Sequence, residues 1–495
     1  MNPIKNTSIA TKREIVTSFI LAIFVVTFMW GFWEKGPYAL GVNFTLFLGA
    51  LILFFVSKLR TNSTYSKSDL AWIIPLLLMA LSPALYENPF FKPFIIPGFT
   101  AVLAFFFAYS WMDKKNEIDW NVFFLVKIIG RLLSFFVYLK MLLLSFLASV
   151  FYKSESRYGM LKRIVGGVVL LLIALLIIVP ILSSADPLFA EKLKPIYDFV
   201  ANILGTAFIG KVIACVALAT IILTSLLAWG RPNAVAESKA GKPLDLLVTS
   251  IVLGGMFIVY LLFLWVQLDR LWVGALPFDF SETEELVKSG FWQLLFLTFI
   301  NIAIFLTLYR RTPSAGQKLL GAFSIASILL LVSSAHRMIL YVTYYGFSYE
   351  KFYASYSVLF CAVLFVWLVT RLFVAKKSNV VKFLAFQFLW MFALVSVFPV
   401  EEFILRSNMS LVKKEGSHIR LSEMSMLSSD VYNKIKEYEA KGLLNEKIEA
   451  YSVAGENVDT NNTTYDWSKW IGEREKELSD KEWYEYNLSV LNANR

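Results

Sequence analysis

The chain has 495 residues, of which 57% are hydrophobic and only 17% are charged. Soluble globular proteins carry about 25% charged residues, so this composition excludes an ordinary soluble domain. The formal net charge is +10, but most cations lie in short loops between apolar runs and form no basic face for nucleic acid. We therefore expect an integral membrane protein that contacts lipid and has no nucleic-acid partner.

Apolar runs long enough to cross a bilayer recur along the chain. A bilayer core of about 30 Å needs roughly 20 apolar residues in a helix. Eleven runs fit, at about residues 15–33, 38–57, 70–86, 94–112, 164–183, 203–229, 247–268, 291–309, 319–341, 355–373 and 383–400. They lack the alternation of a barrel, and backbone groups in lipid must be paired within their own segment. We predict an all-α transmembrane bundle of about ten or eleven spans, with a small helical soluble domain at its C-terminal end.

Basic residues in the connecting segments predict the orientation. The first run is too long for a signal peptide, so we interpret it as a membrane helix that follows a basic N-terminus. The N-terminus and the exits of the even-numbered runs carry most cations, including Lys12, Arg13, Lys58, Arg60, Arg231, Arg310, Arg311, Arg371 and Lys376. The odd-numbered exits carry more acids. This pattern predicts a cytoplasmic N-terminus and a C-terminal tail outside.

Residues 120–152 are apolar but do not fit as a further span, because a span there would reverse the orientation of every later loop. A polar stripe at helical spacing comprises Lys127, Arg131, Ser134, Tyr138 and Ser145. We interpret the segment as an amphipathic helix on the cytoplasmic surface, with a re-entrant hairpin as the alternative.

The charge density rises abruptly after residue 400. Ser429 and Asp430 can cap one helix, Asp480 can cap another, and Trp467 and Trp470 stand at helical spacing between them. The predicted segments are N-terminal transmembrane helices (1–119), a surface helix with a basic loop (120–163), the main bundle (164–400), and a soluble, mostly helical extracytoplasmic tail (401–495).

Ionisable residues inside the apolar runs are the candidate functional groups. Each costs roughly 2.5–3.5 kcal/mol to insert, so such residues are retained for a reason. Under the predicted topology, Asp186, Asp269, His336 and Arg337 form a candidate polar cluster at the outer mouth of the bundle. The secondary candidates are Lys211, Arg270, Tyr341 and Tyr345. For Lys211 and Arg270, snorkelling to the headgroups is the simpler explanation, and His336 is either a proton shuttle or a structural hydrogen-bonding residue.

Familiar catalytic motifs are absent from the sequence. It has no GxSxG, HExxH, GxxxxGK[ST] or GxGxxG pattern. Cys215 and Cys361 lie in apolar runs with no neighbouring ligand pattern, which favours small buried side chains over a zinc site or a disulfide. We therefore expect no cofactor and no metal, and we name no catalytic residue.

Several short stretches resemble one bacterial family. They are Ser183–Ala190, Ser289–Leu294, Arg337–Tyr341, Tyr345–Ser348, Pro399–Asn408, Leu427–Asp430 and Trp483–Asn487. In this order they are similar to the multi-pass membrane family called domain of unknown function 4173. The resemblance implies a multi-pass protein of a bacterial cytoplasmic membrane and supplies no activity. It adds Asp186, Pro187, Gly290, Arg337, Tyr341, Tyr345 and Gly346 as positions to test.

Three functions stay open at this point. The favoured one is a non-enzymatic membrane subunit, scaffold or sensor whose tail binds a protein partner. The alternatives are a transporter or lipid-handling permease that uses the outer polar cluster, and a membrane enzyme acting on a lipid-linked substrate. The sequence does not determine the substrate, the partner or the oligomeric state.

Overall fold

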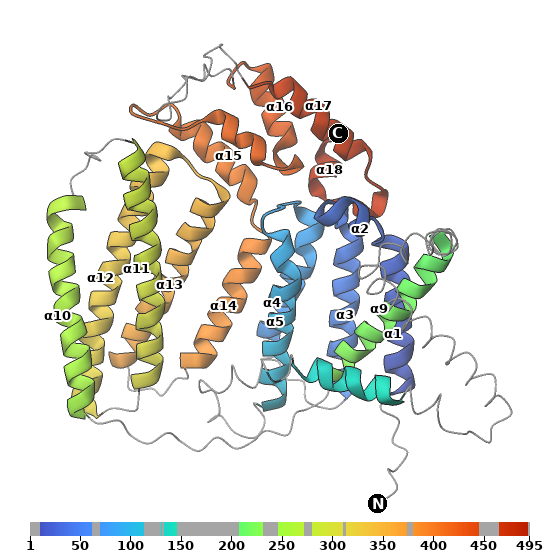
Figure 1. Cartoon of the computed structure of the whole chain (residues 1–495), viewed down its shortest axis with the longest axis horizontal. Helices are drawn as coiled ribbons and strands as arrows, with labels where there is room; N and C mark the ends of the chain where they lie inside the picture. Colours follow the sequence, from blue (N-terminus) through green and yellow to red (C-terminus); the bar gives the residue numbers. More distant parts are fainter. Residues whose placement is uncertain are drawn as a thin grey trace, which may run out of the picture. The chain divides into compact units, whose positions relative to one another are not determined.

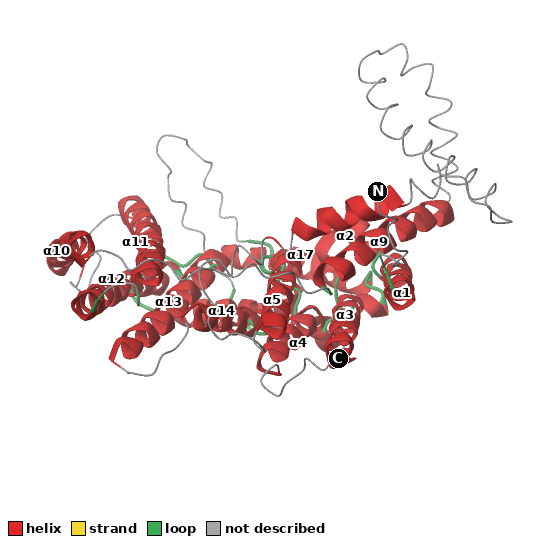
Figure 2. Cartoon of the chain, turned by 90° about the horizontal axis from the view of Figure 1, so that it is seen from below, coloured by secondary structure: helices red, strands yellow, loops and turns green. Residues whose placement is uncertain are grey.

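The computed structural model describes most of the chain as helices in two compact units (Figures 1 and 2). The described ranges are 10–61, 70–112, 130, 133–145, 207–230, 246–271, 280–309, 313–373, 380–444 and 465–493. The smaller unit comprises residues 1–34 and 126–234, and the larger comprises 35–125 and 235–495. Every regular element in the described ranges is a helix, which confirms the predicted all-α class.

Two long helices, α1 (Lys12–Phe28) and α9 (Ala207–Trp229), pack along each other in the smaller unit. A capping box starts α1, in which the Thr11 hydroxyl accepts from the Glu14 amide and the Glu14 carboxylate accepts from the Thr11 amide. A separate helix at Leu133–Ser145 falls within the predicted surface segment. It exposes Phe136 and Val137, and its placement relative to a membrane stays a prediction.

The larger unit holds a row of apolar helices that lie side by side (Figure 1). They are α3 (Val42–Thr61), α4 (Leu70–Leu85), α5 (Lys92–Met112), α10 (Leu246–Leu271), α11 (Phe280–Leu308), α12 (Ser314–Tyr345), α13 (Tyr349–Phe373) and α14 (Val380–Ser396). Before α3, the short α2 (Gly31–Lys35) and η1 (Gly36–Ala39) continue the chain from α1. Across both units a helix coincides with every predicted run except 164–183, which lies outside the described residues.

Three of the described helices are long and apolar enough to cross a membrane by themselves. They are Gly210–Trp229, Ser314–Tyr345 and Tyr349–Leu372. A fourth span is possible if α14 and α15 (Val400–Leu411), which bend by 70°, count as one. The fold is thus that of an all-α membrane protein, while ten or eleven spans stay a prediction.

After α14 the chain forms a C-terminal domain of short helices. They are α15, η3 (Leu421–Met426), η4 (Ser429–Val431), α16 (Tyr432–Ala440), α17 (Trp467–Ser479), η5 (Trp483–Glu485) and α18 (Leu488–Ala493). Trp467 and Trp470 are buried in α17, and the Trp470 indole donates to the Ser425 carbonyl at 3.0 Å. Helix α15 leaves α14 at Pro399 and carries Glu401 and Glu402 in its first turn.

The predicted helix caps in this domain were partly wrong. Helix α16 exists, but its N-cap is Val431, with no side-chain cap; Ser428 instead caps the preceding η4 by accepting from the Asp430 amide. Asp480 ends α17 and does not start a new helix, and Glu482 provides the cap of η5.

The C-terminal domain lies at one end of the helices of the larger unit (Figure 1). The Val42 amide at the start of α3 donates to the Tyr486 carbonyl at 3.0 Å, and the His418 amide donates to the Tyr344 carbonyl at the end of α12 at 2.8 Å. The turn between α4 and α5 also meets the domain, through Glu87 and Asp430. We call this the domain end of the bundle and the opposite one the far end.

Candidate functional site

A cluster of five ionisable side chains lies where the membrane helices meet the C-terminal domain. It consists of Glu87, Lys92, Glu401, Asp430 and Lys481, and we call it the buried charge cluster. Glu87, Lys92 and Glu401 each expose 2% of their surface, and the Lys481 side chain exposes 6%. Charged groups so deeply buried are stable only when they are paired or neutralised.

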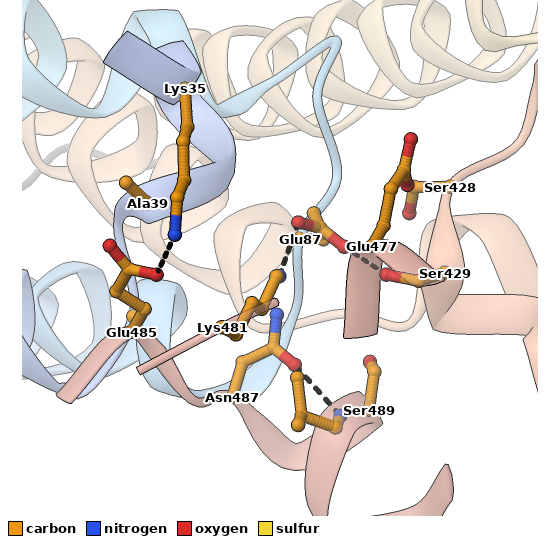
Figure 3. Close-up of polar contacts among 12 residues, drawn as sticks. Lys35, Ala39, Glu87, Ser428, Ser429, Glu477, Lys481, Glu485, Asn487 and Ser489 are labelled. Atoms are coloured by element: carbon orange, nitrogen blue, oxygen red, sulfur yellow. Dashed lines mark hydrogen bonds and ion pairs between the residues drawn. The ribbon is translucent and has the colours of Figure 1, made fainter. Parts of the chain in front are cut away.

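Glu87 stands in the turn after α4 and reaches into the C-terminal domain (Figure 3). Its carboxylate accepts from the Lys481 ammonium at 2.6 Å and from the Ser429 hydroxyl. Burial by itself would raise the pKa of Glu87, but the ammonium groups of Lys481 and Lys92 outweigh it and hold the pKa below 4.5. Glu87 is therefore the ionised partner of a buried ion pair.

Asp430 in η4 accepts hydrogen bonds from the turn between α4 and α5. Its carboxylate accepts from the Glu87 amide at 2.8 Å and the Asn88 amide at 3.0 Å, and also from the Ser489 hydroxyl. Asn88 has a φ of 26°, a left-handed conformation that asparagine tolerates better than most residues. The Asn88 side chain then donates to the Tyr353 hydroxyl at 3.0 Å, so the same turn joins η4 to α13.

Glu401 lies in the first turn of α15, and its hydrogen-bond partners within the described ranges are uncharged. Its carboxyl group contacts the Tyr349 hydroxyl at 2.6 Å, and it accepts from the Ser428 amide and hydroxyl at 2.7 and 2.8 Å. Burial, and secondarily the neighbouring Asp430 carboxylate, raise the pKa of Glu401 to about 8. This environment therefore favours the protonated, neutral form of Glu401.

Lys92 starts α5 beside the same turn. Its ammonium is buried and has no hydrogen-bond partner among the described residues. Burial lowers the pKa of Lys92 to about 8, and the Glu87 carboxylate opposes this shift. Lys92 thus contributes a positive charge that Glu87 stabilises through space.

A second ion pair fastens the domain next to α3. The Lys35 ammonium contacts the Glu485 carboxylate at 3.0 Å and donates to the Asp480 carbonyl at 2.9 Å (Figure 3). The Glu485 side chain exposes only 2% of its surface. Gly41 lies so close to this segment that a Cβ there would stand 2.3 Å from the Glu485 carbonyl oxygen.

A family model matches most of the chain, including most of the buried charge cluster. The model of a domain of unknown function (DUF4153) matches residues 73–438, from α4 into α16. The chain belongs to this family. The predicted number 4173 was therefore wrong, while membership of an uncharacterised family is confirmed. No curated protein and no solved structure matches the chain.

The match includes four members of the buried charge cluster. Glu87, Lys92, Glu401 and Asp430 lie within the matched residues, and Lys481 lies beyond them.

Three of the residues predicted from the sequence share the buried side of α12. Arg337 and Tyr341 are buried there, and the Tyr345 ring contacts the Tyr341 ring at 5.3 Å. The Lys351 ammonium stands 4.3 Å from the centre of the Tyr341 ring, and His418 stacks on Tyr345 at 5.5 Å. His336 is partly buried on the same helix.

The other predicted site residues are not brought together in the described part of the chain. Asp186 lies outside the described residues. Asp269 and Arg270 belong to the last turn of α10, but their side chains are not described. Lys211 belongs to the smaller unit, where its ammonium stands 5.6 Å from the Trp30 ring. The predicted grouping of Asp186, Asp269, His336 and Arg337 therefore stays a prediction.

Sequence reasoning missed the buried charge cluster. A usable signal existed in Glu87, an acid in the short turn between two apolar runs, and in Glu401, directly after the last run. Nothing local indicated that these two acids meet Asp430, because their contact depends on which helix ends lie together.

Proposed function

We propose that the protein is a non-enzymatic membrane subunit or scaffold whose C-terminal domain is a rigidly mounted platform for a protein partner. One observation carries the proposal. The domain is joined to the membrane helices by the buried pair of Lys481 and Glu87, and again by Lys35 and Glu485. A domain on a flexible tether would have no need for such contacts.

A rigid mount favours partner binding because it reduces the entropy lost when a complex forms. The domain also presents large side chains to its surroundings, with Met426 exposed by 76% and Trp483 by 62%. Aromatic residues and methionine are enriched in protein interfaces. These residues supply the kind of surface that the proposal requires.

The distribution of charge supports an extracytoplasmic position for the platform. Lys58 lies near the end of α3 and Arg371 in the last turn of α13, and Lys318 and Lys382 lie near the starts of α12 and α14. All four lie at the far end of the bundle, because the other ends of these helices meet the C-terminal domain. The positive-inside rule places such a basic end in the cytoplasm. We accordingly propose a multi-pass protein of a bacterial cytoplasmic membrane, with its C-terminal domain outside.

The test is affinity purification of the tagged full chain from its native membrane in mild detergent, followed by mass spectrometry. We expect a near-stoichiometric protein partner with the wild type and a reduced yield of it with Lys481→Ala. Lys441→Ala is the matched control, because Lys441 makes only an exposed ion pair with Glu437 and should retain the partner. A solitary wild-type protein would refute the proposal.

A permease is the second candidate function. Its supporting observation is a hydrogen-bonded chain inside the apolar helices, in which Tyr260 donates to Asn301 at 2.5 Å and Asn301 donates to Ser327 at 3.0 Å. Polar groups buried in a bundle are candidate substrate contacts, and Arg337 lies further along α12. A thermal-shift screen of polar and anionic small molecules tests this reading. A hit that stabilises the wild type and not Arg337→Ala would favour the permease.

A further inference from the structure

The buried charge cluster carries a net negative charge if every member is ionised. It contains three carboxyl groups, on Glu87, Asp430 and Glu401, and two amines, on Lys92 and Lys481. With Glu87 and Asp430 negative and both lysines positive, the cluster is neutral. An ionised Glu401 would add a further negative charge in a buried site, which is strongly unfavourable.

Contacts within the cluster identify which acid stays neutral. Glu87 has the Lys481 ammonium at 2.6 Å, and Asp430 accepts two backbone amides and the Ser489 hydroxyl. The hydrogen bonds at both positions favour a carboxylate, and at Asp430 they oppose burial and the Glu87 charge, which raise its pKa. Among the described residues no ammonium contacts Glu401, and its partners are the Tyr349 hydroxyl and Ser428.

The geometry around Glu401 accommodates a proton with no change other than rotation of one hydroxyl. The Tyr349 oxygen lies 2.6 Å from Oε1 and is able to accept as well as donate. The other oxygen, Oε2, continues to accept from the Ser428 amide and hydroxyl. A protonated Glu401 is therefore fully hydrogen-bonded once the Tyr349 hydroxyl rotates.

We propose that Glu401 is a proton-binding site that controls docking of the C-terminal domain: it holds a proton while the domain is docked and releases it when the domain separates from the helix ends. The Ser428 hydroxyl links this site to the rest of the cluster, because it donates to Glu401 and accepts from the Asp430 amide. A charge appearing on Glu401 therefore disturbs η4 and the turn that η4 binds.

The groups around Glu401 determine how docking of the C-terminal domain depends on pH. The titratable groups that face it are Tyr349 and Tyr353 of α13, Asp430 of η4 and Tyr38 of η1. Glu87, Lys92 and Lys481 are reached through Asp430, and Arg474 and Glu477 of α17 are reached through Tyr38. Burial and the Asp430 carboxylate raise the pKa of Glu401 from 4.5 to about 8. Docking thus takes up a proton, and rising pH through this range favours separation.

The direct test is infrared spectroscopy of the full chain in detergent micelles, from mildly acidic to alkaline pH. We expect a protonated-carboxyl C=O band that disappears with a midpoint near pH 8. The band should be absent in Glu401→Gln and present in Glu402→Gln. Glu402 is the matched control, since it is the next residue and pairs with exposed Arg406. A band that persists in E401Q, or that is lost in E402Q, would overturn the proposal.

A second measurement follows docking itself and remains available if E401Q does not fold. Tyr349→Phe removes the hydroxyl that contacts Oε1 of Glu401, so the midpoint of the infrared band should shift from its wild-type pH. Limited proteolysis of the C-terminal domain should accelerate at alkaline pH in the wild type, and at the correspondingly shifted pH in Y349F. An unchanged midpoint in Y349F would contradict the assignment. These readouts require no partner, so their failure is distinct from failure of the proposed scaffold function.

Discussion

Lys481 and Glu87 lie 394 residues apart in the sequence and form an ion pair of 2.6 Å in which both side chains are nearly closed to solvent. Lys481 belongs to the segment between α17 and η5, and Glu87 belongs to the turn between α4 and α5. The contact joins two distant parts of the chain, because it links the last short helices to the ends of two apolar helices. Its strength therefore bears on whether the C-terminal domain is fixed or free.

Removing one partner of this pair should be severely destabilising. Lys481→Ala leaves the Glu87 carboxylate buried without its ammonium, and breaking a buried pair in this way costs about 3–5 kcal/mol. Thermal unfolding of the detergent-solubilised chain, followed by tryptophan fluorescence, measures the loss. Lys441→Ala breaks an exposed pair and should cost about 0–1 kcal/mol.

A double variant separates loss of the pair from loss of packing. Glu87→Gln with Lys481→Met removes both charges while keeping similar volumes, and such replacements of buried pairs are often close to neutral. We expect it to recover most of the stability lost in K481A. A double variant as unstable as K481A would show that the ion pair is not the source of the loss.

The second prediction concerns Gly41, whose backbone lies close to the backbone of Glu485 and Tyr486. A Cβ at this position would stand 2.3 Å from the Glu485 carbonyl oxygen and 2.4 Å from that of Tyr486. Backbone atoms cannot move aside as a side chain does, so Gly41→Ala should displace η5 and cost several times the roughly 1 kcal/mol typical of a point mutation. Faster proteolysis of the C-terminal domain would report the displacement.

Gly49 in α3 is the matched control for that variant. Nothing lies within 4 Å of a Cβ built on it, so Gly49→Ala should stabilise the helix by roughly 0.5–1 kcal/mol. Equal effects at Gly41 and Gly49 would mean that the approach of η5 to α3 does not persist in solution.

The third prediction concerns the polar chain inside the apolar helices. Asn301→Leu removes the acceptor of the Tyr260 hydroxyl and the donor to Ser327, and both partners are then left inside the bundle. Interhelical hydrogen bonds in membrane proteins average about 0.6 kcal/mol, with a maximum near 1.7, so we expect a loss of about 1–2 kcal/mol for the two. Unfolding in mixed micelles measures it. Adding Tyr260→Phe should cost little more, because its partner is already gone.

The helices of this protein were predictable because each is marked by a continuous run of apolar residues, which is a local feature of the sequence. The runs 70–86 and 94–112 were found from apolar length alone, and α4 and α5 occupy them within two residues at each end. In the tail, Trp467 and Trp470 stand at helical spacing in the sequence, and α17 carries both.

The site was not predictable because its members have no local pattern in common. Asp430 was interpreted as a helix cap, which is the usual role of an aspartate before an apolar helix. In the structure α16 has no side-chain cap and Ser428 caps the preceding η4, while the Asp430 carboxylate accepts from the amides of Glu87 and Asn88. That partnership follows from the packing of α4 and α5 against the C-terminal domain, which no spacing in the sequence encodes.

The last prediction is a stability maximum at weakly acidic pH, and the two limbs of the curve have different origins. The pKa of Glu401 rises from 4.5 to about 8 in the folded protein, so its contribution is complete below pH 4.5 and is lost as the pH approaches 8. The pKa of Glu87 is held below 4.5, so its contribution is present above that value and is lost as the pH falls further. Unfolding temperatures measured across this range should fall on both sides of that maximum.

Glu401→Gln should remove the decrease in stability toward alkaline pH and keep the decrease toward acid pH. Glu402→Gln should leave both decreases unchanged, since Glu402 lies on the outer side of α15 beside Arg406. A wild-type curve that rises steadily to pH 8 would show that Glu401 is ionised in the docked domain, and the charge balance would then have to come from a group outside the cluster.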